Sequence, residues 1–557
     1  MGYRITRGWA RTRYIYFAMI FSKPVQCYGC RNDEKLIYKG FWRKFDQGNN
    51  FPEMAGKKLS FHFDFSTQNG EKIKLKIGLS AVSIEGALNN LRTEIPHWDF
   101  EKTRMEARQM WENELSRIVI KSTDENKKIF YTAFYHALIS PAVYQDVDGK
   151  YRGINHEIHK AEGFINYTIF SLWDTYRALH PLLTLLYPDR TSDMINSMLA
   201  HYDQSPEKML PVWSHHGNEN WCMIGYHSVA VIADAHVKGI MDFDGKKALE
   251  ASITTSTRPF YDNIGEYMKY GYVPDGKNVN SASITLEYAY DDYTIACLAN
   301  ALNDTVNAAK YFKRSLNYRN LFDPSTGFIR PKKIDGSLRI PFDPLSTHGQ
   351  GFIEGNSWNY SFYIPHDIPH FISLLGGEKV FIRRLDSLFS MHLEDKYFKE
   401  TEDVTRVGII GNYVHGNEPS HHIPYLYNWT SKPWKTQEKI PMILRSMYRD
   451  APDGLCGNDD CGQMSAWYIF SSLGFYPVCP GTTQYAIGSP YFDEAAIMLP
   501  GNKTLILKAP GLSEKNIYIQ SISLNGKSIK TPFIDHKDVL SGGELIFYMG
   551  EKPKNSF

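Results

Sequence analysis

The sequence predicts a multidomain protein of mixed α plus β class, because the spacing of its apolar residues changes twice along the chain. Residues 1–97 contain short apolar or alternating runs, such as YIYFAMIF and KIKLKIGLSAV, separated by turn-rich pieces, and we expect strands there. Residues 98–480 mostly repeat apolar positions at helical spacing. Strand-like runs return in residues 481–557, where SLNGKSI predicts a hairpin with an Asn-Gly turn.

The first helical segment is residues 98–120, most of which read KTRMEARQMWENELSRIVI. The pattern predicts a helix that links the sheet region to the helical region after it. Its apolar positions are Met105, Met110, Trp111 and Leu115. Residues 121–480 contain many further helix candidates joined by Gly-, Pro- and Asn-rich loops. Paired helices in one large domain favour an α/α toroid, in which an inner ring of helices presents its loops to a pocket at one end. No sequence repeat is evident, which disfavours a solenoid.

The N-terminus allows two interpretations. MGYRITRGWARTR followed by YIYFAMIF imitates the basic region and short apolar core of a signal peptide. The apolar run is aromatic and β-branched with no small-residue cleavage site after it, so we favour a buried strand. We therefore expect the chain to begin inside a sheet, with N-terminal sequence missing. No stretch approaches the roughly 20 apolar residues of a membrane span.

Composition excludes some functions. The 557 residues carry 62 Lys and Arg against 61 Asp and Glu without a basic run, which argues against a nucleic-acid partner. Aromatic residues make up 14%, which fits either a carbohydrate-handling protein or a large aromatic core. The pair Cys27 and Cys30 lacks a second pair at similar spacing, so it does not predict zinc. Cys456 and Cys461 could form a disulfide in an oxidising compartment, but we favour two thiols.

Three stretches of the C-terminal half combine a carboxylate, an amide, Gly and aromatic residues. They are EGNSWNY from Glu354, HGNEPSHHIPY from His415 and GNDDCGQMSAWY from Gly457. Burying a carboxylate is costly unless something pairs with it. We therefore expect a polar pocket, and sugars, with apolar ring faces and many hydroxyls, suit such a pocket.

Glu354 follows the apolar Phe352 and Ile353. Desolvation by such neighbours would raise its pKa and keep it protonated, as a general acid requires. The alternative is a structural Glu bonded to the backbone.

Asp459 and Asp460 precede the helix candidate GQMSAWYIFSSLG, where one Asp is explained as a helix cap. The other would suit a general base, and an acid and a base together are what glycoside hydrolysis requires.

The loop HGNEP offers Asn417 and Glu418 as oxygen ligands for a hard cation such as calcium. His415, His421 and His422 would suit zinc better, but their spacing matches no zinc motif such as HExxH. A hydrogen-bonded polar loop remains the alternative.

WDTYR places Trp173 and Asp174 at a predicted helix start. Asp174 could hold a substrate hydroxyl while Trp173 stacks on the sugar ring; the alternative is a helix cap with a core Trp. HHGNENWCMIGYH from His215 and EYAYDDY from Glu287 are similar loops, which we interpret as pocket walls or loop supports.

Six motifs in order resemble glycoside hydrolase family 92, a family of α-mannosidases. They are SLWDTYRALHPLLTLLYP, GNENWCMIGYHSVAVIADA, TLEYAYDDYTIACLA, EGNSWNYSFYIPHDIP, HGNEPSHHIPYLYN and GLCGNDDCGQMSAWYIFSSLGFYPVCPG. The resemblance runs from about Gly8 to about Phe547. It implies a partial N-terminal β-sandwich over 1–97, a linking helix over 98–120, an (α/α)6 catalytic barrel over 121–480 and a short C-terminal β element over 481–557. The family's sandwich is usually longer, so we expect an N-terminally truncated member.

The resemblance also implies an activity: calcium-dependent, exo-acting hydrolysis of terminal α-linked mannose with inversion. On matching positions, Glu354 becomes the general acid and Asp460 the general base. The resemblance also implies which residues contact the substrate and which bind the metal. Trp173, Asp174 and Trp358 would contact mannose, and Asn417, Glu418 and Asp460 would bind Ca2+.

Two alternatives to this function stay open. The chain could be an inactive or mannose-binding relative because its sandwich is incomplete, or an (α/α)6 hydrolase of another sugar. The expected partners are mannose-containing glycans. The family suggests a periplasmic or secreted protein, although this chain has no convincing signal peptide. The linkage preference and the oligomeric state cannot be read from the sequence.

Overall fold

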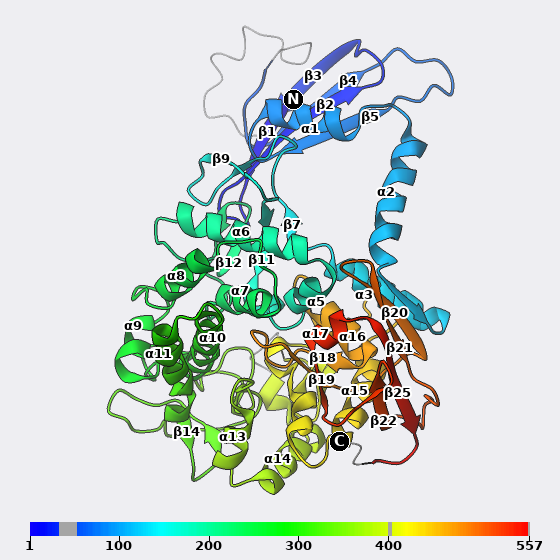
Figure 1. The fold of residues 1–557 in the computed structure, drawn as a ribbon. Helices are drawn as coiled ribbons and strands as arrows, with labels where there is room; N and C mark the ends of the chain where they lie inside the picture. The colour runs from blue at the N-terminus through cyan, green and yellow to red at the C-terminus, as the bar shows by residue number, and fades with distance from the viewer. Residues whose placement is uncertain (33–52, 399–403, 555–557) are drawn as a thin grey trace.

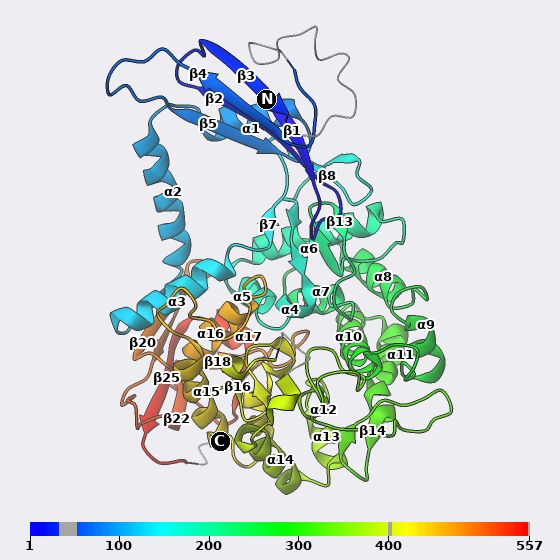
Figure 2. The same cartoon turned by 180° about the vertical axis from the view of Figure 1, so that it is seen from behind.

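The computed structural model describes residues 1–32, 53–398 and 404–554. A sheet-rich lobe stands at one end, a long helix descends from it, and a large helical domain lies beside a C-terminal sheet (Figure 1). The reverse view shows the same three parts from behind (Figure 2). The predicted multidomain α plus β class is confirmed.

The N-terminal lobe is built on an antiparallel sheet of order β1-β2-β5, formed by Gly2–Thr6, Arg13–Phe21 and Leu75–Ser80. Strand β2 contains YIYFAMIF, so the prediction of a strand is confirmed, but the prediction that it is buried is wrong because only Ala18 is buried. Helix α1 (Ile84–Glu94) packs against β2 and β5. The contact requires Gly78, because a Cβ there would lie 2.2 Å from the carbonyl oxygen of Ala87. A separate ribbon pairs β3 (Cys27–Asn32) with β4 (Leu59–Asp64).

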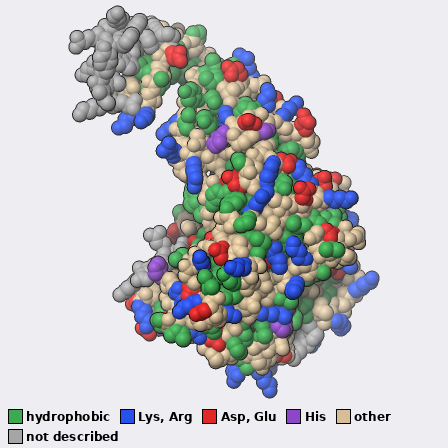
Figure 3. All heavy atoms as spheres, turned by 90° about the vertical axis from the view of Figure 1, so that its left-hand side faces the viewer, with side chains coloured by type: hydrophobic (Ala, Val, Ile, Leu, Met, Phe, Trp, Pro, Cys, Tyr) green, Lys and Arg blue, Asp and Glu red, His purple; other side chains and the backbone are tan. Residues whose placement is uncertain are grey.

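The opposite face of this sheet is open. Every second side chain of β5 lies on this face. The exposed fractions of these side chains are 44% for Leu75, 50% for Ile77 and 59% for Leu79. The side chains of a strand alternate between its two faces, so α1 covers only one set. The lobe projects from the body of the molecule (Figure 3).

Helix α2 (Phe100–Leu115) is the predicted link, and none of its residues is buried. The Asp99 side chain caps its first turn by accepting from the Lys102 N–H, and Arg108 pairs with Glu112 along its surface. The helix ends at Leu115. The following residues, Ile118–Lys121, form strand β6 and pair with β20 (Glu494–Leu499) at the edge of the C-terminal sheet.

The helical domain has buried inner helices and more exposed outer ones. Each residue of α5 (Leu179–Leu186) and α16 (Gln463–Leu473) is buried, as are most of α7 (Ser228–Val237) and α10 (Ser281–Ala301). Helix α5 contacts α7 and α16, and α10 contacts α7. Around them pack α3 (Asp124–Ala137), α6 (Pro188–Gln204), α8 (Gly245–Thr255) and α11 (Thr305–Ser315). Helix α10 is enclosed although it carries Glu287, Asp291 and Asp292, so these carboxylates need partners inside the domain.

Most of the remaining elements of this domain are short, apart from two helices of 13 and 14 residues. They are α4 (Leu172–Thr175), α9 (Ile264–Tyr270), α12 (Ser357–Tyr360), α13 (Ile368–Leu374), α14 (Glu378–Ser390), α15 (Trp434–Met447), the 3₁₀ turns η5 (Glu418–Ser420) and η6 (Ile423–Trp429), and small ribbons such as β12 (Trp213–His215) with β13 (Asn218–Glu219). The loops that carry the predicted site residues come from this part of the chain.

The C-terminal sheet has the order β23-β22-β25-β21-β20-β6. Its other strands are β21 (Lys503–Lys508), β22 (Tyr518–Leu524), β23 (Lys527–Ile529) and β25 (Gly543–Gly550). The predicted Asn-Gly hairpin joins β22 to β23, with both turn residues, Asn525 and Gly526, at positive φ. Among the residues that the structure describes, no helix is long and apolar enough to cross a membrane.

Candidate functional site

Three carboxylates from distant parts of the sequence meet in the helical domain. Asp174, Glu418 and Asp460 each offer an oxygen atom, and these atoms lie within 4.8 Å of one another. Asp174 is on α4, Glu418 begins η5, and Asp460 lies in the turn before α16. Like charges this close, two of them on buried residues, are costly unless a cation or a proton compensates for them.

Close backbone packing brings two of these loops together. A Cβ at Gly457 would lie 2.2 Å from the carbonyl oxygen of Gly416, so the stretches HGNEP and GNDD pass each other at glycines. Gln463, the first residue of α16, attaches this helix to the start of α5, because its Oε1 accepts from the N–H groups of Ala178 and Leu179 at 2.9 and 3.2 Å. The glycines that bracket the three stretches thus have a physical role in the convergence.

Asp460 and its neighbour Asp459 have different roles. The Asp459 Oδ1 accepts from both the N–H and the Oγ of Ser465, at 3.1 and 2.6 Å, so Asp459 caps the first turn of α16. Asp460 has φ 44°, and Cys461 and Gly462 continue this left-handed turn at 57° and 96°. Left-handed backbone is unfavourable for most residues and is enriched at functional sites. The turn directs Asp460, rather than Asp459, to the carboxylate group.

Glu354 lies beside the same group. It also has a left-handed backbone, with φ 49°. The Nδ2 of Asn417 donates to its carbonyl oxygen at 3.0 Å and to its Oε2 at 3.1 Å. The amide of Asn417 therefore connects the loop that carries Glu418 to the loop that carries Glu354.

The clustered carboxyl groups raise one another's pKa. Burial, followed by the charge of Asp460, raises the pKa of Asp174 well above its ordinary value, and Glu354 adds to the effect. The same two causes, in the same order, raise the pKa of Glu418. Buried Arg177 opposes both shifts. In the described part of the chain, neither carboxylate oxygen of Glu418 has a hydrogen-bond partner.

The three histidines of HGNEPSHH have hydrogen-bond partners within the protein. His415 lies between the hydroxyls of Tyr413 and Tyr448, each 2.8 Å from a ring nitrogen. His421 Nε2 lies 3.0 Å from the carbonyl oxygen of His415 and His422 Nε2 lies 2.8 Å from that of Phe362. These contacts support a structural role for the three imidazoles and weaken the zinc alternative.

The two predicted aromatic contacts lie in different surroundings. Trp173 is buried, its Nε1 donates to Glu287 Oε1 at 3.1 Å, and the guanidinium of Arg177 lies 4.8 Å from its ring. Trp358 is half-buried and packs edge-on against Phe328 at 5.1 Å. Both rings have protein partners, and their contact with a sugar stays a prediction.

The sequence did not predict that His227, Glu287 and Asp291 form a buried group of ion pairs. His227 lies 3.0 Å from Glu287 Oε2 and 2.7 Å from Asp291 Oδ1. Burial lowers the pKa of His227, but Asp291 and Glu287 outweigh this and raise it to about 9. The sequence showed these residues as polar positions in YHSVAV and EYAYDDY. Their pairing depends on the contact between α7 and α10.

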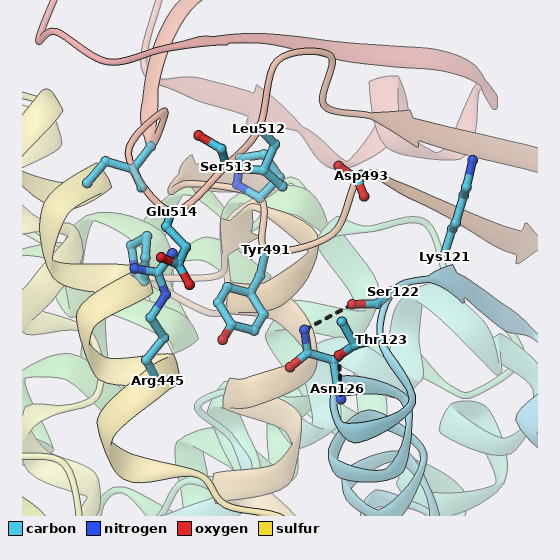
Figure 4. A pocket seen from close by; sticks show the side chains of 13 residues that line it. Lys121, Ser122, Thr123, Asn126, Arg445, Tyr491, Asp493, Leu512, Ser513 and Glu514 are labelled. Atoms are coloured by element: carbon cyan, nitrogen blue, oxygen red, sulfur yellow. Dashed lines mark hydrogen bonds between the residues drawn. The ribbon is translucent and has the colours of Figure 1, made fainter.

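Two further features are the cysteines near Asp460 and a separate surface hollow. Cys456 and Cys461 are thiols, as favoured from the sequence. A surface hollow of about 560 Å³ lies between the start of α3, α15 and the loops around Tyr491 and Glu514 (Figure 4). None of the predicted site residues lines it.

The sequence matches a family model and a curated relative. Residues 86–551 match the family model described as the glycosyl hydrolase family 92 catalytic domain. A curated relative from Arthroderma benhamiae, described as an uncharacterized secreted glycosidase, is 29% identical over 551 residues, which cover 90% of this chain. The chain spans 64% of that relative's length.

Solved structures are similar over almost the whole chain. A family 92 alpha-mannosidase from Bacteroides thetaiotaomicron is 40% identical with a TM-score of 0.90, covering 99% of this chain and 72% of its own. The same enzyme with mannoimidazole bound has a TM-score of 0.91. An inverting mannosidase from the same organism is 33% identical with a TM-score of 0.89, covering 99% of this chain and 75% of its own.

Proposed function

Because the chain belongs to glycoside hydrolase family 92, we propose that it is an exo-acting, calcium-dependent α-mannosidase that releases terminal mannose from glycans with inversion. The observation that carries this proposal is the meeting of Asp174, Glu418 and Asp460 beside Glu354. The bound mannoimidazole of the similar enzyme supports a mannose substrate.

The donor set fits a hard cation. All three clustered groups are carboxylates, and calcium prefers oxygen ligands. The two unpartnered oxygens of buried Glu418 are an additional reason to expect a cation. We infer that Asp174, Glu418 and Asp460 would hold calcium, with Asn417 adjoining. When bound, calcium would compensate the clustered negative charge and polarise sugar hydroxyls.

The protein's own residues perform the proton transfers in this proposal. Glu354, whose carboxyl group is oriented by Asn417, gives a proton to the departing glycosidic oxygen. Asp460 accepts a proton from the water that attacks the opposite face of the sugar. Direct attack by water inverts the anomeric centre, which requires an acid and a base but no covalent intermediate. Asp174, in addition to its place among the carboxylates that would hold calcium, would contact the terminal sugar.

The acid role is tested with Glu354→Gln. We expect kcat/KM for methyl α-mannoside to fall by about 10²–10⁴-fold, the usual contribution of general acid catalysis. An activated dinitrophenyl α-mannoside should lose much less, because its leaving group needs no proton. Equal losses on both substrates would contradict the assignment. Wild-type protein that binds mannose in calorimetry but releases none would support the mannose-binding alternative.

The metal and the stereochemistry need separate measurements. Chelation should abolish activity, and calcium added back should restore it, because the clustered carboxylates repel one another without a cation. Proton NMR at early times should show β-mannose as the first product from an α-mannoside. Full activity in excess chelator would exclude the metal proposal, and an α-product would exclude inversion.

The curated relative is described as secreted, and on that basis we infer that this protein also acts outside the cytoplasm. Fractionation of producing cells checks this inference.

A further inference from the structure

A buried arginine lies between the carboxylate group and the ion pairs of His227. Arg177 follows shortly after α4, the helix that carries Asp174, and is only 4% exposed. Its Nε donates to the carbonyl oxygen of Trp173 at 2.9 Å, and its Nη2 lies 3.7 Å from Glu287 Oε1. A guanidinium stays charged in a protein, so its burial is costly unless negative groups face it.

Aromatic rings fix the guanidinium at this place. Its carbon lies 4.8 Å from the ring centroids of Trp173 and Tyr176, and 5.3 Å from that of Tyr363. The hydroxyls of Tyr176 and Tyr363 are hydrogen-bonded to each other. A cation over the face of an aromatic ring is attracted by the ring's quadrupole. The positive charge of Arg177 is therefore held inside the domain.

Arg177 and Glu418 line the same small hollow, of about 10 Å³, and the residues that form its wall are buried. In the described part of the chain, Arg177 Nη2 and both carboxylate oxygens of Glu418 have no hydrogen-bond partner. His421 and His422 also line the hollow, but burial lowers their pKa to about 3 and about 4, so both are uncharged at neutral pH. Arg177 thus supplies the positive charge beside Glu418.

This charge acts on two of the three clustered carboxylates. Burial and the charge of Asp460 raise the pKa of Asp174 and of Glu418, and Arg177 is a cation that opposes both shifts. On its other side, Glu287 lies closer to His227, at 3.0 Å, than to Arg177, at 3.7 Å. Because Glu287 is shared in this way, it neutralises Arg177 only in part.

We propose that Arg177 is a positioning residue, a fixed counter-cation that holds Asp174 and Glu418 together without calcium and weakens the binding of calcium. The proposal rests on the proposed function, because it concerns the cation site that this function requires. Two cations that neutralise the same carboxylates repel each other, so the presence of one lowers the affinity for the other. Such a site stays assembled when it is empty and releases calcium more readily than carboxylates alone would.

The first test titrates calcium alone into the calcium-free full chain by calorimetry. For Arg177→Met, we expect the Kd for calcium to fall by about tenfold, a typical coupling between two sites. Arg177→Lys keeps the charge and should have a Kd close to that of the wild type. An unchanged or higher Kd in Arg177→Met would overturn the proposal.

Melting temperatures separate this role from a merely structural one. Without calcium, Arg177→Met should melt below the wild type, and calcium should raise its Tm by more than it raises that of the wild type, because a ligand stabilises according to its affinity. Arg314→Met is the matched control, since it removes a guanidinium whose Nη2 lies 3.0 Å from buried Asp292. Its Tm should fall equally with and without calcium. The same behaviour in Arg177→Met would reject the proposal.

A second variant covers the case in which Arg177→Met does not fold. The double variant Arg177→Met/Glu287→Gln removes both charges of the pair, and its Kd for calcium should still fall, because Arg177 and not Glu287 lines the hollow with Glu418. An unchanged Kd in this variant would overturn the proposal as well.

The outcomes also separate this proposal from the proposed function. Wild-type protein that binds calcium but releases no mannose rejects the hydrolase and leaves the role of Arg177 standing. Calcium binding with the same Kd in wild type and Arg177→Met rejects only the role of Arg177. Wild-type protein that binds no calcium rejects both.

Discussion

The N-terminal lobe and the helical domain differ in how far they enclose their side chains. Strand β1 has no buried side chain and β2 buries only Ala18, while one face of β5 lies open. In α10, by contrast, even Glu287, Asp291 and Asp292 are fully buried. The enclosed domain can hold charged groups at fixed positions, because burial makes any unpaired arrangement costly. The proposed chemistry lies in that domain.

The largest effect that this comparison predicts is on activity. Asp460→Asn should keep the fold, because Asn tolerates left-handed backbone, and should lower kcat by about 10²–10⁴-fold through loss of the base. Steady-state kinetics with methyl α-mannoside measures this loss.

The adjacent Asp459→Ala provides the matched control for Asp460→Asn. It removes the cap of α16, so we expect a loss of about 1 kcal/mol in the free energy of unfolding and much more residual activity. If the two variants lose activity equally, the division into base and cap is wrong.

The next effect is on stability. Leu286→Ala, in the middle of α10, should lower the free energy of unfolding by about 2–5 kcal/mol, because it leaves a cavity in a fully enclosed site. Ile77→Thr, on the open face of β5, should change it by no more than about 0.5 kcal/mol. Urea unfolding followed by circular dichroism measures both. Similar losses in the two variants would show that the open face is covered in solution.

The last predicted effect is a dependence of stability on pH. His227 lies between Glu287 and Asp291, with Tyr176 stacked on its ring at 4.4 Å and Arg177 near Glu287. Its pKa is raised from 6.5 to about 9 in the folded protein. The protonated form is favoured by folding, so its stabilising contribution is complete below pH 6.5 and is lost as the pH rises through about 9.

Thermal unfolding between these two pH values checks the contribution of His227. The melting temperature of the wild type should fall as the pH rises, and His227→Gln should flatten that dependence. A variant with the same slope as the wild type would assign the effect to other groups.

The sequence identified much of the site but not its geometry. The acid, amide and glycine content of three stretches was enough to select Glu354, Glu418 and the pair Asp459–Asp460, and the family resemblance then chose Asp460. It could not show that Asp174, which is more than 200 residues from Glu418, belongs to the same carboxylate group. Nor could it show that Asn417 donates to Glu354, because that contact depends on how two loops pack.

Similar limits apply to the fold. Apolar spacing identified the strands at both ends and the linking helix, because local periodicity determines which faces can be buried. It could not show that Ile118–Lys121, directly after that helix, pairs with a strand near the end of the chain. Strand partners are chosen by contacts between distant segments, which have no local signal.

The sequence by itself determined the class of the fold, the family resemblance and the residue types needed for acid, base and cation chemistry. These follow from side-chain chemistry and from spacing along the chain. Only the tertiary structure decided which carboxylates meet and which aspartate of the Asp459–Asp460 pair accepts hydrogen bonds from the first turn of α16. The physical reason is that these properties depend on distances between segments, and such distances are set by packing of the whole domain.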